Sequence, residues 1–184
     1  VQLDSTVLAA YESWCTASVN DPDPGFWGHW PRYYAEMPVK QDWVQAAAKR
    51  CQTAVVVIGR SAGEDRENTL KKGSFYLTNK EKALLDAVTT AFQKVVLVLN
   101  IGSIMDFAEI DAYGDKISAI LLAWQLGMES GNAVADVLTG QVNPSGRLTD
   151  TIAKTYADYP AQNFGNKAEN RYTEIGRASC RERV

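Results

Sequence analysis

The densest cluster of reactive side chains lies in the stretch GRSAGEDREN, residues 59–68, directly after an apolar run. It holds three carboxylates and two guanidinium groups: Glu64, Asp65, Glu67, Arg60 and Arg66. A carboxylate can serve as a nucleophile or as a general acid or base once burial or a neighbouring charge adjusts its pKa. Carboxylate chemistry is therefore the first hypothesis for this stretch. A polar loop without a function has the same composition, so the cluster alone leaves both interpretations open.

Other mechanisms find less support in the sequence. GRSAG matches the G-x-S-x-G pattern of a serine nucleophile, with Ser61 in the reactive position. This pattern belongs to the α/β hydrolases, whose catalytic histidine follows the serine along the chain. The only histidine here, His29, precedes Ser61. The glycine-rich phosphate-binding motifs are absent, and no histidine, cysteine and carboxylate side chains have the spacing of a metal site. We therefore expect neither a metal nor a cofactor.

The composition is that of an ordinary folded domain. The chain has 184 residues, 46% of them hydrophobic, and a formal net charge of −3, which suits one domain with a sizeable core. The acidic balance argues against nucleic acid and anionic membranes as partners, and no apolar run approaches the roughly 20 residues of a membrane span. The start resembles no signal peptide, which favours the cytoplasm, although Val1 at the first position indicates that the chain begins inside a longer protein.

Hydrophobic spacing predicts the elements that would position the carboxylates. Three continuous apolar runs predict buried strands: 54–58, 95–99 and 117–123. Helical spacing predicts helices over these ranges: 3–18, 41–51, 78–93, 105–113 and 133–138. Thr78 and Glu81 form a capping box at the start of one helix, and Gly140 suits the end of another. Strands that alternate with helices predict a mainly parallel sheet between two helical layers, a three-layer α/β/α sandwich.

The carboxyl ends of parallel strands meet at one edge of a sheet, which is where ligands bind in such domains. Here those ends carry residues 59–68, NIGS (100–103) and WQLGMES (124–130), all of them polar or glycine-rich. We therefore expect these three loops to lie together. Glu129 lies in the third loop, and we expect its negative charge to stabilise the N-terminus of the next helix rather than to act in catalysis.

Two segments fall outside this pattern. Residues 20–34 contain three prolines and two glycines, which exclude regular structure, together with several aromatic residues. We expect these aromatic residues to pack on the core, with the lining of a groove as the alternative. Residues 174–184 have neither a helical nor a strand period and resemble translated adapter sequence, so we treat them as an artefact outside the fold.

Several motifs in order resemble the C-terminal-type domain of glycoside hydrolase family 3, the β-glucosidase family. They are AVVVIGRSAGEDREN, KGSFYLTNKEKALL, KVVLVLNIGSIMDF and ISAILLAWQLGMESGNAVADVLTGQVNPSGRLTDT. The resemblance covers residues 37–173, and residues 1–36 lead into that domain as a helix and an aromatic-rich loop. The loop after the first strand is shorter here than is common in the family, and LTDT replaces the commoner Leu-Pro-x-Thr.

The resemblance implies a function. In this family an α/β sandwich packs against a separate TIM-like barrel; the barrel supplies an aspartate nucleophile, and the sandwich supplies a general acid/base glutamate, which falls on Glu64. The chain would then be part of a retaining β-glycosidase, with a β-linked glucoside or oligosaccharide as substrate and the barrel of the same chain as partner. Such a fragment is expected to be inactive alone. The alternative is a structural or sugar-contacting sandwich without chemistry, in which Glu64 is a surface carboxylate paired with Arg66.

Overall fold

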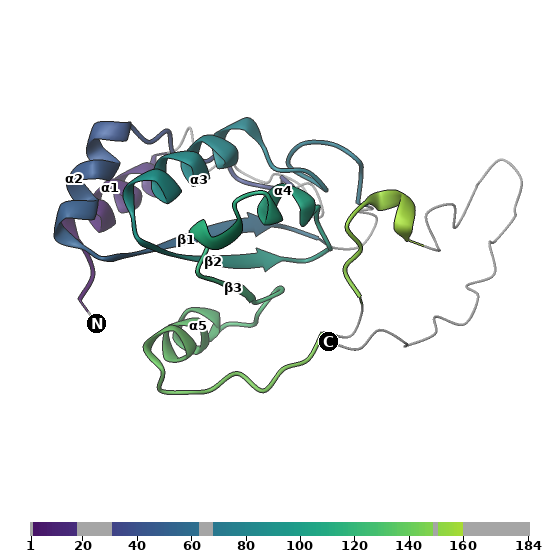
Figure 1. Cartoon of the computed structure of the whole chain (residues 1–184). Coiled ribbons are helices and arrows are strands. Elements are labelled where there is room, and N and C mark those ends of the chain that lie inside the picture. The colour runs from purple at the N-terminus through teal and green to yellow at the C-terminus, as the bar shows by residue number, and fades with distance from the viewer. Residues whose placement is uncertain (1, 18–30, 63–67, 149–150, 160–184) are drawn as a thin grey trace, which may run out of the picture.

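The computed structural model describes residues 2–17, 31–62, 68–148 and 151–159 (Figure 1). Its helices are α1 (Ser5–Thr16), α2 (Gln41–Arg50), α3 (Asn79–Ala91), α4 (Ala108–Asp111) and α5 (Ser130–Thr139), and two 3₁₀ turns cover Gly114–Lys116 and Tyr156–Asp158. Its strands are β1 (Thr53–Arg60), β2 (Lys94–Ile101) and β3 (Ala119–Leu122). Within the described ranges, no helix combines the length and the apolar character that crossing a membrane requires.

The three strands form one parallel sheet in the order β1-β2-β3. Val56 pairs with Leu97, and Leu97 pairs with Ile120, so consecutive strands are neighbours. Parallel neighbours need a long connection, which α3 provides between β1 and β2 and α4 provides between β2 and β3. The predicted parallel sheet is confirmed, and β1 and β2 each extend further than their apolar runs.

The helix α3 begins where the sequence predicts it. Thr78 accepts a hydrogen bond from the Glu81 backbone N–H at 3.1 Å, and the Glu81 carboxylate accepts one from the Thr78 N–H at 2.7 Å. This capping box satisfies two N–H groups that a helix start otherwise leaves unpaired. The helix then packs its apolar side on the sheet, where Leu85, Leu97 and Leu99 are fully buried.

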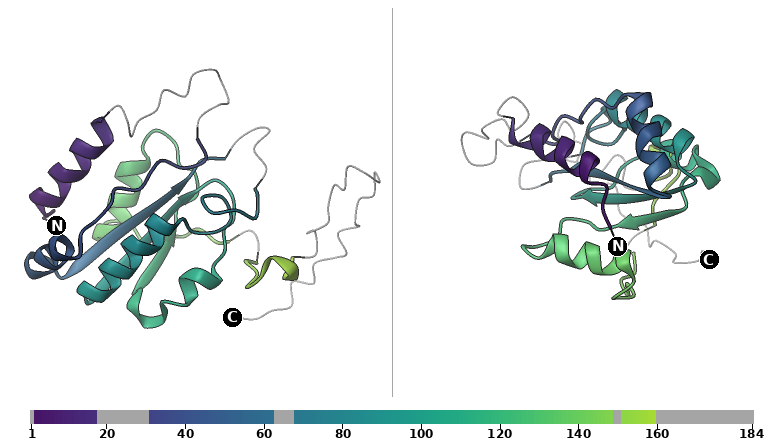
Figure 2. Two further views of the ribbon diagram at one scale, coloured as in Figure 1. Left: turned by 90° about the horizontal axis from the view of Figure 1, so that it is seen from above. Right: turned by 90° about the vertical axis from the view of Figure 1, so that its left-hand side faces the viewer.

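The two faces of the sheet are packed differently. Figures 1 and 2 show α3 and α4 on one side of the sheet and α5 on the other, the order of a three-layer sandwich. On the α3 side the β1 side chains are buried, whereas Val55 and Val57 on the opposite side are 49% and 53% exposed. Helix α5 contains no buried residue. The core of the described chain therefore lies mainly on the α3 face, although Val98 on the other face of β2 is also buried.

This asymmetry predicts a stability difference between two adjacent valines of β1. Val56→Ala should lower the free energy of unfolding by about 2 kcal/mol, because two methyl groups leave the buried face. Val57→Ala removes the same atoms from the exposed face and should cost less than about 1 kcal/mol. Urea unfolding of this chain and the two variants measures both values. Equal losses would mean that the second face is as well packed as the first.

Candidate functional site

The loops that follow the three strands meet at one edge of the sheet, as the sequence predicts. Gly102, after β2, donates its N–H to the Arg60 carbonyl at 3.1 Å, and Gln125, after β3, donates a side-chain N–H to the Ala62 carbonyl at 3.3 Å. A Cβ at Gly102 would come within 2.5 Å of Ala62 and Gln125, so glycine is what permits this close approach. Trp124 turns the third loop with a φ of 57°, a value that is uncommon for a bulky residue and recurs at functional sites.

The charged stretch after β1 is held on both flanks. Before it, Ser61 donates its backbone N–H to the Arg32 carbonyl at 2.7 Å. After it, Asn68 donates a side-chain N–H to the Ile104 carbonyl at 2.6 Å. The residues between these anchors that carry the predicted carboxylate chemistry lie outside the described residues: Glu64, Asp65, Arg66 and Glu67. The two flanks of the stretch therefore have defined positions, one at the end of β1 and the other beside the loop that follows β2.

Arg60, the last residue of β1, is a buried cation with every donor in use. Its guanidinium makes two hydrogen bonds to the Glu81 carboxylate, one of them 2.7 Å long. Its remaining N–H groups donate to the carbonyls of Gly59, Ser74 and Tyr76. These partners account for the five N–H donors of an arginine. The Arg60 and Glu81 side chains are only 2% and 4% exposed, so the pair is almost completely buried.

This burial corrects the view of Arg60 as one of the charges around the predicted carboxylates. Side chains alternate along a strand, and Val56, Ile58 and Arg60 all point into the core on the same face of β1. The guanidinium is therefore neutralised by Glu81 of α3 and is covered by the Tyr33 ring, whose centroid lies 5.6 Å from its carbon. The alternation from Val56 onward is the sequence signal that could have predicted this inward orientation.

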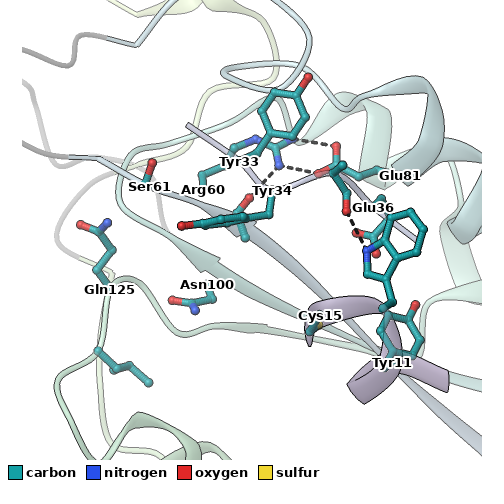
Figure 3. Close-up of a pocket in the computed structure, with 14 residues that line it drawn as sticks. Tyr11, Cys15, Tyr33, Tyr34, Glu36, Arg60, Ser61, Glu81, Asn100 and Gln125 are labelled. Atoms are coloured by element: carbon teal, nitrogen blue, oxygen red, sulfur yellow. Dashed lines mark hydrogen bonds and ion pairs between the residues drawn. The ribbon is translucent and has the colours of Figure 1, made fainter. Parts of the chain in front are cut away.

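A pocket of about 680 Å³ opens at the carboxyl edge, between α1, the segment before α2 and the strand ends (Figure 3). Its aromatic lining is Tyr11, Trp14, Tyr33 and Tyr34. Its polar lining is Glu36, Arg60, Ser61, Glu81, Asn100 and Gln125. Tyr33 and Tyr34 are 40% and 53% exposed. Tyr34 therefore follows the alternative and lines the groove, whereas Tyr33 lines the groove and also packs over the buried Arg60. The part of the predicted aromatic loop up to residue 30 lies outside the described residues.

Glu36 is a titratable group of this pocket that the sequence analysis missed. Burial raises the pKa of Glu36, and the negative charge of Glu81 raises it further. Burial, with the nearby charge of Glu36, also raises the pKa of Tyr11 to about 12. Both shifts favour the uncharged form of the side chain. No sequence signal places Glu36 beside these groups, because the pocket joins segments that are distant along the chain.

The remaining predicted residues take structural positions. The Ser61 hydroxyl donates to the Pro31 carbonyl, which ties it to the preceding segment, and His29 lies outside the described residues. Glu129 precedes α5 and accepts a hydrogen bond from the Asn132 side chain at 2.6 Å. Within the part of the chain that the structure describes, no group of three or more histidine, cysteine, aspartate or glutamate side chains could hold a metal ion.

The fold and the site define a class: a parallel α/β domain with a polar and aromatic pocket at the carboxyl edge of its sheet. Comparison with known families makes the assignment specific. Residues 7–178 match the model of the glycosyl hydrolase family 3 C-terminal domain. The chain therefore belongs to glycoside hydrolase family 3, and the resemblance seen in its motifs is confirmed.

The related proteins are much longer than this chain. It is 41% identical over 174 residues to a β-glucosidase of Ruminococcus albus, an alignment that covers 94% of this chain and 18% of that protein. It is 36% identical over 153 residues to β-glucosidase A of Butyrivibrio fibrisolvens, covering 71% of this chain and again 18% of the relative. The chain thus spans less than a fifth of these curated relatives and corresponds to one part of such a protein.

Solved structures agree with this assignment. A β-glucosidase from Paenibacillus barengoltzii superposes with a TM-score of 0.81 at 37% identity, covering 87% of this chain and 17% of that one. The β-glucosidase 3B of Thermotoga neapolitana in complex with glucose superposes with a TM-score of 0.75 at 32% identity, covering 90% of this chain and 23% of that one. At these identities and TM-scores the α/β sandwich fold of the family domain is confirmed.

The buried ion pair predicts a large effect of breaking it and a smaller effect of removing both charges. Arg60→Met leaves Glu81 charged and without its partner, and should lower the free energy of unfolding by about 3–5 kcal/mol. Adding Glu81→Gln removes the stranded charge while an amide oxygen can still cap α3, so the double variant should recover a large part of the loss. Urea unfolding of the single and double variants measures this difference. A double variant less stable than Arg60→Met would contradict it.

The raised pKa of Glu36 predicts a pH-dependent stability. The folded state binds the Glu36 proton more tightly than the unfolded state does, so this group favours folding at acid pH and loses that contribution as pH rises through its raised pKa. Glu36→Gln should therefore gain stability relative to the parent chain between pH 4 and pH 7. Urea unfolding at both pH values tests the sign, with Glu12→Gln on exposed α1 as the control for removing one carboxylate. A relative loss of stability at pH 7 would refute the prediction.

Proposed function

We propose that this chain is part of a retaining β-glycosidase of the β-glucosidase type and that Glu64 is its general acid/base. In this proposal a TIM-like barrel elsewhere in the same protein supplies the aspartate nucleophile, and the substrate is a β-linked glucoside or oligosaccharide. The two relatives described above are named β-glucosidases and extend far beyond the region aligned here, which supports a role for a second domain.

The observation that carries the proposal is the anchoring of the carboxylate-bearing stretch. Its first residues are tied to the segment before α2 through Ser61, and its end is tied to the loop after β2 through Asn68. A catalytic group must be held close to its productive position, and groups anchored on rigid elements meet that need better than free loops. The tethers at both flanks therefore support the proposal.

The proposed reaction uses two carboxyl groups on opposite sides of the scissile bond. Glu64 protonates the glycosidic oxygen while the barrel aspartate attacks the anomeric carbon, which gives a covalent glycosyl-enzyme and releases the leaving group. Glu64, now ionised, then removes a proton from the water that hydrolyses this intermediate. Retaining enzymes place the two carboxyl groups about 5–5.5 Å apart, so both domains must contribute to one site.

The charge environment supports a proton-carrying Glu64. A general acid needs a pKa near the working pH, and negative neighbours raise the pKa of a carboxyl group. Asp65 and Glu67 are adjacent in sequence, whereas Arg66 acts in the opposite direction. Arg60 is almost completely buried and is paired with Glu81, so we expect it to lower the pKa of Glu64 less than its sequence position suggests.

A second hypothesis is a sandwich domain that contacts sugar without taking part in the chemistry. The aromatic and polar pocket favours this form of the alternative over a purely structural domain, because aromatic rings and polar side chains together suit a sugar. The two hypotheses differ in one measurable respect, which is whether the rate depends on the side chain at position 64.

Replacing the three carboxylates one at a time in the full-length protein separates them. Glu64→Gln should lower kcat on cellobiose by roughly 10²–10⁴-fold, the usual contribution of general acid/base catalysis. The loss should be smaller on aryl glucosides with good leaving groups, which need little protonation. Azide should partly restore activity, because it attacks the glycosyl-enzyme without base assistance. This chain alone should show no significant hydrolysis, since the proposed nucleophile lies elsewhere.

Asp65→Asn and Glu67→Gln are the matched controls and should each keep most of the activity. If one of them loses activity while Glu64→Gln keeps it, the acid has been assigned to the wrong residue. If all three variants keep near parental rates on cellobiose, the domain supports no acid/base chemistry, and the non-catalytic alternative holds.

A further inference from the structure

We propose that Asn68 is a positioning residue for the acid/base catalysis, because it holds the end of the stretch that carries Glu64. The inference rests on the proposed function and deepens it, since it names a residue that acts through Glu64 rather than on the substrate. Residues 63–67 lie outside the described residues, so the supporting contacts are those of the groups at the two ends of this stretch.

The Asn68 side chain uses both its nitrogen and its oxygen to hold the chain. The amide nitrogen donates to the Ile104 carbonyl at 2.6 Å. The amide oxygen accepts hydrogen bonds from the Ser74 hydroxyl at 2.6 Å and from the Thr69 backbone N–H at 3.1 Å. Because both groups of the amide are engaged, the side chain and the backbone that carries it cannot turn without losing hydrogen bonds.

Ser74 connects this contact to the buried arginine at the other end of the stretch. Ser74 is 7% exposed, and its hydroxyl also accepts a hydrogen bond from the Thr69 N–H at 3.0 Å. Its backbone carbonyl accepts one from the Arg60 guanidinium at 3.4 Å. Arg60 ends β1 just before the stretch, and Asn68 directly follows it. The residues at which the stretch begins and ends are therefore joined through one buried serine.

A second contact holds the same segment to the loop after β2 without Asn68. Asp106 donates its backbone N–H to the Phe75 carbonyl at 2.8 Å, and Phe75 donates its own N–H to the Thr69 carbonyl at 3.1 Å. The Phe75 side chain is buried at 2% exposure. Truncating Asn68 leaves these contacts in place, so we expect the variant to fold while the end of the stretch is released.

The released end matters because a general acid must stay within hydrogen-bond reach of the oxygen that it protonates. Glu64 follows Ala62 by two positions and precedes Asn68 by four. A segment held at both ends has fewer conformations than one held at a single end, so the second anchor lowers the entropy cost of placing the carboxyl group. Asn68 thus contributes to the rate by restricting where Glu64 can lie.

Two substrates that differ in their need for a proton test this role in the full-length enzyme. Cellobiose releases a sugar alkoxide that needs protonation, whereas 2,4-dinitrophenyl β-D-glucoside releases a phenolate that does not. Asn68→Ala should lower kcat/KM on cellobiose by roughly 10- to 10²-fold, the effect of misplacing a catalytic group, and on the dinitrophenyl glucoside by less than about 3-fold. Ser74→Ala, which removes the hydroxyl that holds the Asn68 amide, should change the ratio of the two values in the same direction.

A second comparison asks whether Asn68 acts through Glu64. In the Glu64→Gln variant there is no acid to position, so adding Asn68→Ala should lower kcat/KM on cellobiose by less than about 2-fold further. A residue that only supports the fold would cause the same loss in both backgrounds. Asn132→Ala is the matched control, since Asn132 is an exposed asparagine of α5 whose side chain donates to Glu129. It should leave both kcat/KM values unchanged.

Three results would overturn the inference: parental kcat/KM values in Asn68→Ala, an equal loss on both substrates, or the same loss in the Glu64→Gln background. The proposed function fails by a different result, which is a parental rate of Glu64→Gln on cellobiose. A loss in Glu64→Gln together with parental values in Asn68→Ala would overturn this inference alone, so the two failures are distinguishable.

Discussion

The arrangement of the site depends on how the chain accommodates one buried guanidinium. Removing a cation from water at the end of β1 is costly unless each of its donors finds a partner, and Arg60 meets that requirement through Glu81 and three backbone carbonyls. Apart from the Gly59 carbonyl of β1 itself, those partners come from α3 and from the segment that precedes it, so one side chain joins the last residue of a strand to the first turn of a helix. The position at which the chain leaves the sheet is fixed as a result.

That fixed position determines what can be built next to it. Tyr33 covers the guanidinium from the segment before α2, and Glu36 of the same segment lies in the field of the Glu81 carboxylate. The charge of Arg60 is largely compensated by Glu81, and its pKa-lowering effect on Glu36 is smaller than the raising effects of burial and of the Glu81 charge. Burial therefore raises the pKa of Glu36, which lies close to aromatic rings at the edge where the three loops after the strands meet.

Features with a local period could be predicted from the sequence, whereas those that depend on distant segments could not. The apolar runs predicted the strands, Thr78 and Glu81 predicted the start of α3, and Gly140, with a φ of 76°, ends α5 as expected. Arg60 was misjudged because glycine and charge after an apolar run are typical of a loop, although strand alternation continues through it. The pocket could not be predicted, since α1 and the segment around Glu36 have no spacing relation to the strand ends.

The two faces of the sheet contribute unequally to holding the strand ends in place at its carboxyl edge. The side chains that fix the strand ends, Ile58, Leu99 and Ile101, are all fully buried, whereas Val57 is half exposed. Hydrogen bonds between the loops after the strands then join those ends to one another, as Gly102 does with the Arg60 carbonyl. A site made from strand ends needs their relative positions to be rigid, and one close-packed face together with these loop contacts supplies that rigidity. The geometry of the pocket therefore rests chiefly on the α3 face and on the contacts between the loops that follow the strands.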